Sequence, residues 1–191
     1  EAKGSHPADQ SKTLRFLGFK KCIPFDSVAY SLLEDEILSV FDPEDIFTPL
    51  NFKGPFESIH DKINKEGWPY LSECLGKVIF ILEGNNQKIY KNFQYPLMFY
   101  YGEEHDSNTA FLLRNNPLGN EKQISNSTNR FIVRTRSDAG TIESRNNDFT
   151  RLKSALKSNA QIISTDYYRP DIRWSNYRVE FSSALSTRAK N

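Results

Sequence analysis

The sequence contains little cysteine and no long apolar run, which argues against a disulfide-stabilised protein and against a membrane-spanning one. Its 191 residues include two cysteines, Cys22 and Cys74, without the CxxC spacing of a zinc site. Two cysteines are too few for a disulfide scaffold, and either one bridge or two free thiols would suit them. No apolar run approaches the roughly 18 residues that a membrane span needs, and no segment at the start has the composition of a secretion signal.

The chain also carries no large excess of positive or negative charge. The chain has 25 Lys and Arg against 24 Asp and Glu, which gives a net charge of +1. No global field therefore draws it to nucleic acid or to an anionic surface, so any recognition of phosphate must be local. Hydrophobic residues make up 38% and charged residues 26% of the chain, which is typical of a globular protein and predicts one domain over residues 1–191.

Apolar periodicity predicts helices and strands that alternate along the chain. Helical spacing is found at residues 24–41, 55–66 and 148–157, with Asp26 or Ser27 and Asp148 as candidate caps. Short apolar runs rich in β-forming residues predict strands at 77–83, 96–101, 131–136 and 161–165, with a further short strand at 177–182. Such alternation indicates parallel strands in an α/β barrel or a doubly wound sheet, and the missing GxGxxG disfavours the second.

Polar residues that follow the apolar core of each strand are the candidates for a functional site, because sites of α/β proteins collect where strands end. They form four groups, which are Glu1 with Lys3, then Glu83, then Arg134 with Arg136 and Asp138, and finally Thr165, Asp166 and Tyr167. Alternate residues of a strand share a face. Arg134 and Arg136 should therefore point together, away from Phe131, Val133 and Thr135, and their forked donors suit phosphate oxygens.

Structural interpretations of the same residues stay open. The charged pairs at the strand ends could be ordinary salt bridges. Asp166 could orient Arg134 or could cap a loop. The acidic loop at 102–106 could hold a cation, although a run of charges on a loop is usually solvated surface.

Several motifs, taken in order, make the chain resemble the second half of the bacterial-type calcium-dependent phosphoinositide phospholipase C family. The early ones are DEILSVF at 35–41, FTP at 47–49, and GWPYL at 67–71 leading to GKVIFIL at 76–82. The later ones are FIVRTRSD at 131–138, ESRNND at 143–148 and QIISTDY at 161–167, which look like the last two strands with their connecting helix. The resemblance covers nearly the whole chain.

This resemblance implies a TIM-type (β/α)8 barrel of which the chain supplies about the last half, beginning in a strand. It implies that calcium is the cofactor with Glu1 as a ligand, and that Lys3 and Arg134 act in catalysis on a phosphoinositide. Arg136, Glu83, Asp166 and Tyr167 would bind the substrate. The upstream half of the barrel would be needed for activity, contact with the membrane surface would be transient, and the location would be extracellular or periplasmic.

Two rival functions stay open. A glycerophosphodiester phosphodiesterase barrel also carries a Glu-x-Lys strand and a Thr-Asp-Tyr ending, although an aromatic residue usually stands there in place of Arg134. A non-catalytic barrel fragment that binds a phosphorylated ligand is the other. The Glu83-Gly84-Asn85 segment and the acidic loop after Tyr101 depart from the phospholipase pattern and leave the preferred substrate open.

Overall fold

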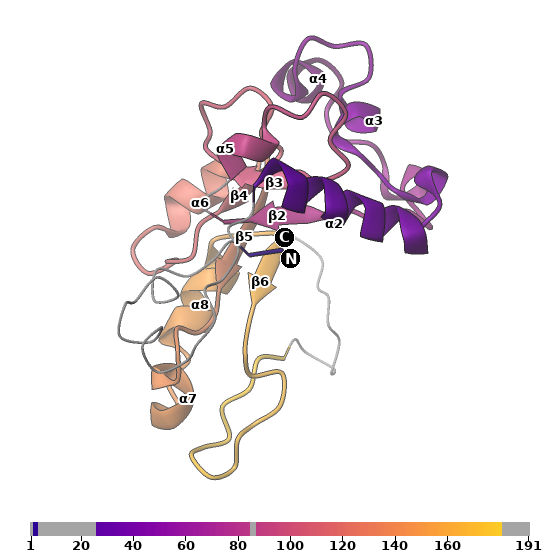
Figure 1. Cartoon of the computed structure of the whole chain (residues 1–191). Coiled ribbons are helices and arrows are strands. Elements are labelled where there is room, and N and C mark those ends of the chain that lie inside the picture. The colour runs from indigo at the N-terminus through magenta and orange to yellow at the C-terminus, as the bar shows by residue number, and fades with distance from the viewer. Residues whose placement is uncertain (1, 4–25, 85–86, 181–191) are drawn as a thin grey trace. The chain divides into compact units, whose positions relative to one another are not determined.

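The computed structural model describes residues 2–3, 26–84 and 87–180 (Figure 1). The chain forms two compact units, Glu1–Ala110 and Phe111–Asn191. Each unit contains parallel strands and helices. The protein is thus an α/β protein with parallel strands, as predicted, and this arrangement is consistent with part of a TIM barrel. No helix of the described residues is both long and apolar enough to cross a membrane.

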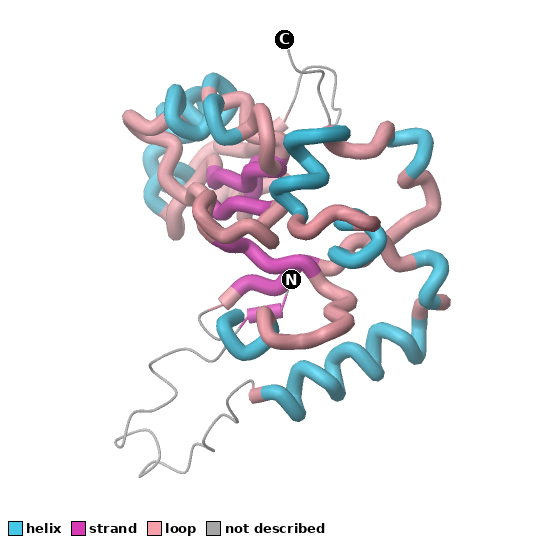
Figure 2. Tube along the Cα trace, turned by 90° about the horizontal axis from the view of Figure 1, so that it is seen from above, coloured by secondary structure: helices cyan, strands magenta, loops and turns pink. Residues whose placement is uncertain are grey.

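Three parallel strands organise the first unit. They are β1 (Ala2–Lys3), β2 (Ile81–Glu83) and β3 (Phe99–Gly102), and β2 pairs with both others. Figure 2 shows the strands of the chain in magenta. The register sets Lys3 beside Glu83 and Leu82 beside Tyr100. The predicted strands at 77–83 and 96–101 are therefore confirmed at their second halves only.

Helix α2 (Ser27–Val40) starts where the sequence predicts it. The side chain of Asp26 accepts a hydrogen bond of 2.9 Å from the backbone N–H of Ala29, which makes it the N-cap. Of the apolar residues whose spacing predicts this helix, Ile37 is buried but Val28 and Leu32 are exposed, and Tyr30 is buried in their place.

The half-buried carboxylate of Glu34 links α2 to the rest of the unit. Its Oε1 accepts hydrogen bonds from the backbone N–H of Leu97, at 2.9 Å, and from the hydroxyl of Tyr90. Burial and the bond to Glu34 raise the pKa of Tyr90. Tyr30 and Ile37 turn with Glu34 into a core that includes Leu82, Tyr90 and Met98.

Short helices fill the rest of the first unit. These are η2 (Pro43–Asp45), α3 (Pro49–Lys53), α4 (Ile59–Glu66), η3 (Leu71–Glu73) and α5 (Gln87–Tyr90). Thr48 and Ser58 cap α3 and α4 through hydrogen bonds of 3.1 Å to backbone N–H groups. Helix α4 confirms the second part of the predicted helix at 55–66, with Ile59 and Ile63 buried as expected.

Gly102 ends β3 at a point where no side chain fits. A Cβ atom there would lie 1.9 Å from Oγ1 of the buried Thr109. We expect Gly102→Ala to lower the free energy of unfolding by about 1–3 kcal/mol, as overpacking does, measured by urea denaturation. Thr109→Ala in the same chain should restore most of this loss, because the closest approach then becomes 3.1 Å. An unchanged stability of the single Gly102→Ala variant would contradict this close approach.

Three more parallel strands organise the second unit. They are β4 (Phe111–Leu113), β5 (Ile132–Arg136) and β6 (Ile162–Ser164), with β5 paired to both others. The helices are α6 (Glu121–Ser127), α7 (Ile142–Asn146) and α8 (Thr150–Lys157). The predicted unit of strand 131–136, helix 148–157 and strand 161–165 is confirmed, and its strands are parallel. Leu112, Ile124, Phe131 and Val133 form its core.

Three predictions about the second unit need correction. Strand β4 and helices α6 and α7 were missed. Asp148 is not the N-cap of α8, which is Phe149, although Asp148 accepts a hydrogen bond of 2.8 Å from the Thr150 N–H. Residues 177–180 form no strand, although the Val179 N–H donates a hydrogen bond of 2.9 Å to Tyr167 O. Residues 181 and 182 lie outside the described part.

Candidate functional site

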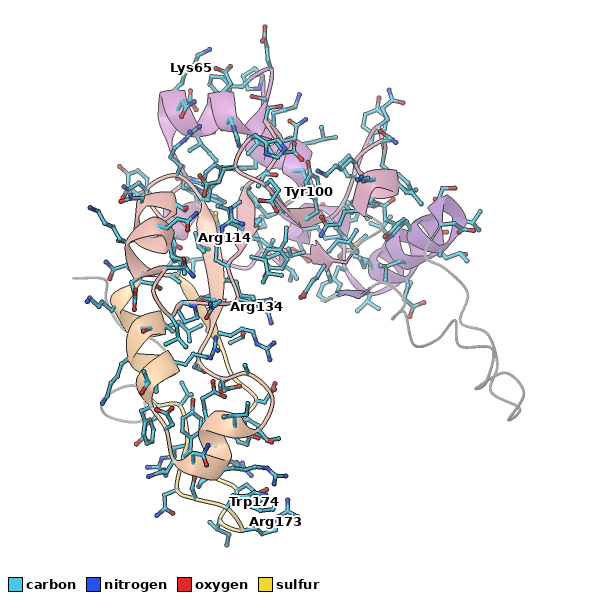
Figure 3. The ribbon with its side chains drawn as sticks, turned by 90° about the vertical axis from the view of Figure 1, so that its left-hand side faces the viewer. Lys65, Tyr100, Arg114, Arg134, Arg173 and Trp174 are labelled. Carbon is cyan, nitrogen blue, oxygen red and sulfur yellow. The ribbon has the colours of Figure 1, made fainter. Side chains whose placement is uncertain are left out.

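The two faces of β5 differ in what they contact. Val133 packs in the core with Ile124 of α6, and Thr135, two residues on, is fully buried and donates a hydrogen bond of 2.6 Å to the carbonyl of Arg114. Arg134 and Arg136 alternate with them and are half-buried. Since neighbouring strand residues point to opposite faces, both guanidinium groups extend from the face of β5 away from α6, as predicted. Arg134 and Arg114 are labelled in Figure 3.

A buried carboxylate joins the carboxyl ends of β5 and β6. Asp138 is 1% exposed. Its Oδ2 accepts hydrogen bonds from the Ser137 hydroxyl, at 2.8 Å, and from the Thr165 hydroxyl, at 2.6 Å. Its Oδ1 accepts a bond of 3.1 Å from the backbone N–H of Asp166. Asp138 thus fixes the loop that carries Asp166 relative to the strand that carries the arginines.

The aromatic side chain of Tyr177 supports this junction from the segment that returns to the base of the loop. Its hydroxyl donates a hydrogen bond of 3.0 Å to the carbonyl of Ser137, and its ring contacts those of Phe149 and Tyr167 at centroid distances of 4.9 Å and 5.7 Å. Burial, with the nearby negative charge of Asp138, raises the pKa of Tyr177 to about 12. Tyr177 is therefore neutral at physiological pH and donates to Ser137.

Asp166 lies beside an arginine of β5. Its Oδ2 is 3.8 Å from Nη2 of Arg136. The register sets Arg136 beside Ser164 and Arg134 beside Ile162, so Asp166 comes two residues after the partner of Arg136 and four after that of Arg134. The sequence left open a contact with Arg134 or a capping role, and the ion pair that the structure shows for Asp166 is with Arg136.

The candidates of the first unit form a separate pair. Lys3 and Glu83 are neighbours in the register of β1 and β2. Glu83 alternates with the buried Leu82 and is half-buried, so it belongs to the face opposite the Leu82 core. Glu1, the predicted calcium ligand, lies outside the described residues. The structure thus aligns Lys3 with Glu83 on neighbouring strands.

In the acidic loop at 102–106, Asp106 already has partners within the protein. Asp106 forms an ion pair with Lys91, and the Tyr100 hydroxyl donates to it at 3.0 Å. Burial by itself raises the pKa of Asp106, but the hydrogen bonds from Lys91, from the Asn108 N–H and from Tyr100 outweigh it, so the pKa lies below its usual range. Burial and the charge of Asp106 raise the pKa of Tyr100.

This group borders a cavity of about 290 Å³. Its other walls are largely apolar and include Pro49, Ile59, Phe93, Met98 and Phe99. Lys91 is paired with Asp106, and Lys53 and Glu57 also line the cavity.

The described residues do not by themselves fit a calcium ion. They contain no group of three or more His, Cys, Asp or Glu side chains that could hold a metal. Asp138, the most buried carboxylate beside the arginines, already accepts from three protein donors. A calcium site would normally need six to eight oxygen ligands.

Comparison with known protein families shows to which family the chain belongs. The model of the phosphoinositide phospholipase C, Ca2+-dependent family matches residues 4–191. The chain belongs to the calcium-dependent phosphoinositide phospholipase C family. No curated protein and no solved structure matches the chain. Membership in this phospholipase family confirms the resemblance that the strand-end motifs indicated.

The sequence pointed to the arginines of this family member but not to the residues that hold their surroundings. Asp138 was noted only as part of the Arg134 group, and its position directly after a buried strand was the signal for a larger role. Tyr177 gave no signal, because nothing in its local sequence connects it to Ser137, 40 residues away.

Proposed function

We propose that the protein is a phosphoinositide-specific phospholipase C that cleaves the phosphodiester between diacylglycerol and the inositol phosphate head group. The observation that carries the proposal is the family match over residues 4–191. The geometry supports it, because two guanidinium groups share one face at the carboxyl end of β5. Bidentate donors of this kind suit phosphoryl oxygens.

In the proposed reaction the inositol hydroxyl next to the phosphate attacks phosphorus. It loses its proton as the new P–O bond forms, the bond to the diacylglycerol oxygen breaks, and that oxygen takes up a proton. The products are diacylglycerol and a cyclic inositol phosphate. Arg134 stabilises the negative charge that grows on the phosphoryl oxygens, and Lys3 contributes a second positive charge. Arg136, paired with Asp166, binds and orients the head group together with Glu83 and Tyr167.

Other parts of the proposal rest on the family alone. The strands would belong to a (β/α)8 barrel of which this chain supplies about the last half, and the upstream half would complete the site. Calcium is included because the family is calcium-dependent, with Glu1 as one ligand. An extracellular or periplasmic location is part of the same proposal.

The test is hydrolysis of phosphatidylinositol by the purified full protein, with products resolved by phosphorus NMR. We expect a cyclic inositol phosphate in the presence of calcium and loss of turnover when EGTA removes it, with recovery on adding calcium back. Magnesium at the same concentration is the control. Release of glycerol phosphate from a deacylated glycerophosphodiester, with no attack on the lipid, would instead assign a glycerophosphodiester phosphodiesterase. No cleavage of either substrate would favour a binding protein.

A further inference from the structure

An exposed, aromatic loop follows β6. From Tyr167 to Val179 the chain leaves the strand, turns and returns, and the backbone N–H of Val179 donates to the carbonyl of Tyr167 at 2.9 Å. The buried Tyr177 anchors the returning segment to Ser137. A turn at the far end is closed by hydrogen bonds from the N–H groups of Trp174 and Ser175 to the carbonyl of Asp171. Figure 1 shows this loop in yellow beyond β6, with α7 beside it.

Large apolar side chains project from this loop into solvent. Tyr168, Ile172 and Trp174 are 73%, 82% and 51% exposed. Since the base of the loop is held by Tyr177, this exposure does not arise from a segment that lacks anchoring. Ile142 of α7 is also 65% exposed. Several large apolar side chains exposed on one short loop indicate a candidate interaction site.

Arginines accompany the exposed aromatic rings. The guanidinium carbon of Arg145 lies 3.9 Å from the centroid of the Trp174 ring, and that of Arg169 lies 5.5 Å from the centroid of the Tyr168 ring. Arg173 stands beside Trp174 at the end of the loop (Figure 3) and pairs with Asp171 at 2.6 Å. Residues 168–174 contain two arginines and one aspartate, and since Arg173 is paired with Asp171, the net positive charge of this segment comes from Arg169.

Trp and Tyr rings, an aliphatic side chain and arginines together match the chemistry of a membrane interface. Indole and phenol rings favour the headgroup level of a bilayer, where one side of the ring is apolar and the other is wet. Arginine pairs with lipid phosphates, and cationic groups near the surface are attracted by anionic lipids. The loop also leaves the carboxyl end of β6, and β5 presents Arg134 and Arg136 toward its own carboxyl end in the same parallel sheet.

We propose that residues 168–174 dock on the surface of an anionic lipid bilayer. Tyr168, Ile172 and Trp174 enter the headgroup region, while Arg169 contacts lipid phosphates. The inference rests on the proposed function, because it identifies the surface through which a lipid-cleaving enzyme would reach substrate in a bilayer.

The test measures sedimentation of the full protein with sucrose-loaded vesicles of phosphatidylcholine and phosphatidylglycerol that contain no phosphoinositide. We expect Ile172→Ala with Trp174→Ala to lower the vesicle partition coefficient about tenfold or more. The two substitutions remove large apolar surfaces that would otherwise leave water when the loop enters the bilayer. Arg169→Gln should weaken binding at low salt and flatten its dependence on salt. The matched control is the double variant Tyr70→Ala with Leu71→Ala. Both side chains are 79% exposed but lie before β2, outside the loop. This variant should bind vesicles as well as the unchanged protein does.

Three results would overturn the docking surface, provided that melting temperatures show all variants folded. They are no vesicle binding by the unchanged protein, equal binding by the loop variants, and equal losses in the control variant. Cleavage of a water-soluble inositol phosphodiester separates this inference from the proposed function. Cleavage that persists without vesicle binding refutes the docking surface alone, and loop-dependent vesicle binding without any cleavage refutes the proposed function alone.

Discussion

Arg134→Lys is expected to lower the turnover of phosphatidylinositol by on the order of a hundredfold, the loss that follows removal of one oriented transition-state donor. Lysine keeps the positive charge but lacks the planar fork that meets two phosphoryl oxygens. The melting temperature should hardly change, because Arg134 is half-buried on the face of β5 opposite the Val133 core. Turnover and melting are measured side by side on the same preparation.

A purely structural role for Arg134 makes the reverse prediction. It gives a lower melting temperature with nearly normal turnover once the protein is folded. Arg178→Lys is the matched control, since Arg178 forms a surface ion pair with Glu180 at 2.8 Å in the same unit, and a surface pair of this kind contributes little. Normal turnover of Arg134→Lys would remove this residue from the active site.

Asp138→Ala is expected to lower the free energy of unfolding by about 3 kcal/mol, because it removes the acceptor of one buried and two partly buried hydrogen bonds. The Thr165 hydroxyl and the Asp166 N–H lose a partner at the junction of β5 and β6. The loss stays moderate since the Ser137 hydroxyl also lies 3.0 Å from the Ser164 carbonyl and can donate there. Urea denaturation of the full protein measures the change.

Two further variants test whether the loss of stability in Asp138→Ala comes from the hydrogen bonds that Asp138 accepts. Asp138→Asn keeps the shape and one acceptor oxygen, so its loss should be smaller than that of the alanine variant. Asp148→Ala removes an exposed carboxylate that accepts one backbone bond of 2.8 Å, and its effect should be about 1 kcal/mol or less. Equal losses for Asp138→Ala and Asp148→Ala would show that the buried network does not stabilise this junction.

The sequence by itself determined the kind of structure and the arginine face of the candidate site. Apolar runs at 131–136 and 161–165 with a helical pattern between them predicted the parallel pair of β5 and β6, because burial on both faces requires such runs. The alternation of Arg134 and Arg136 with Val133 and Thr135 fixed which side chains share a face. Asp26 determined the start of α2, since a cap acts on residues only three positions away.

Tertiary structure alone decided how far each element extends and which face it buries. The run at 77–83 forms a strand only from Ile81. Before that point, Val78 forms an isolated β-bridge with Ile46, and its N–H donates a hydrogen bond of 2.7 Å to the carbonyl of Asp45. Helix α2 is turned by Glu34, whose partner Leu97 is 63 residues distant. Local periodicity carries no information on such partners.

The same limit applies to the surroundings of the site. The role of Asp138 depends on Thr165, 27 residues on, and on the N–H of Asp166, 28 residues on. Short-range patterns report which side chains can be buried or can donate, whereas a buried hydrogen bond also requires an acceptor that only the folded chain brings near. The sequence therefore determined the arginines, and the fold decided that Asp138 and Tyr177 would hold the loop beside them.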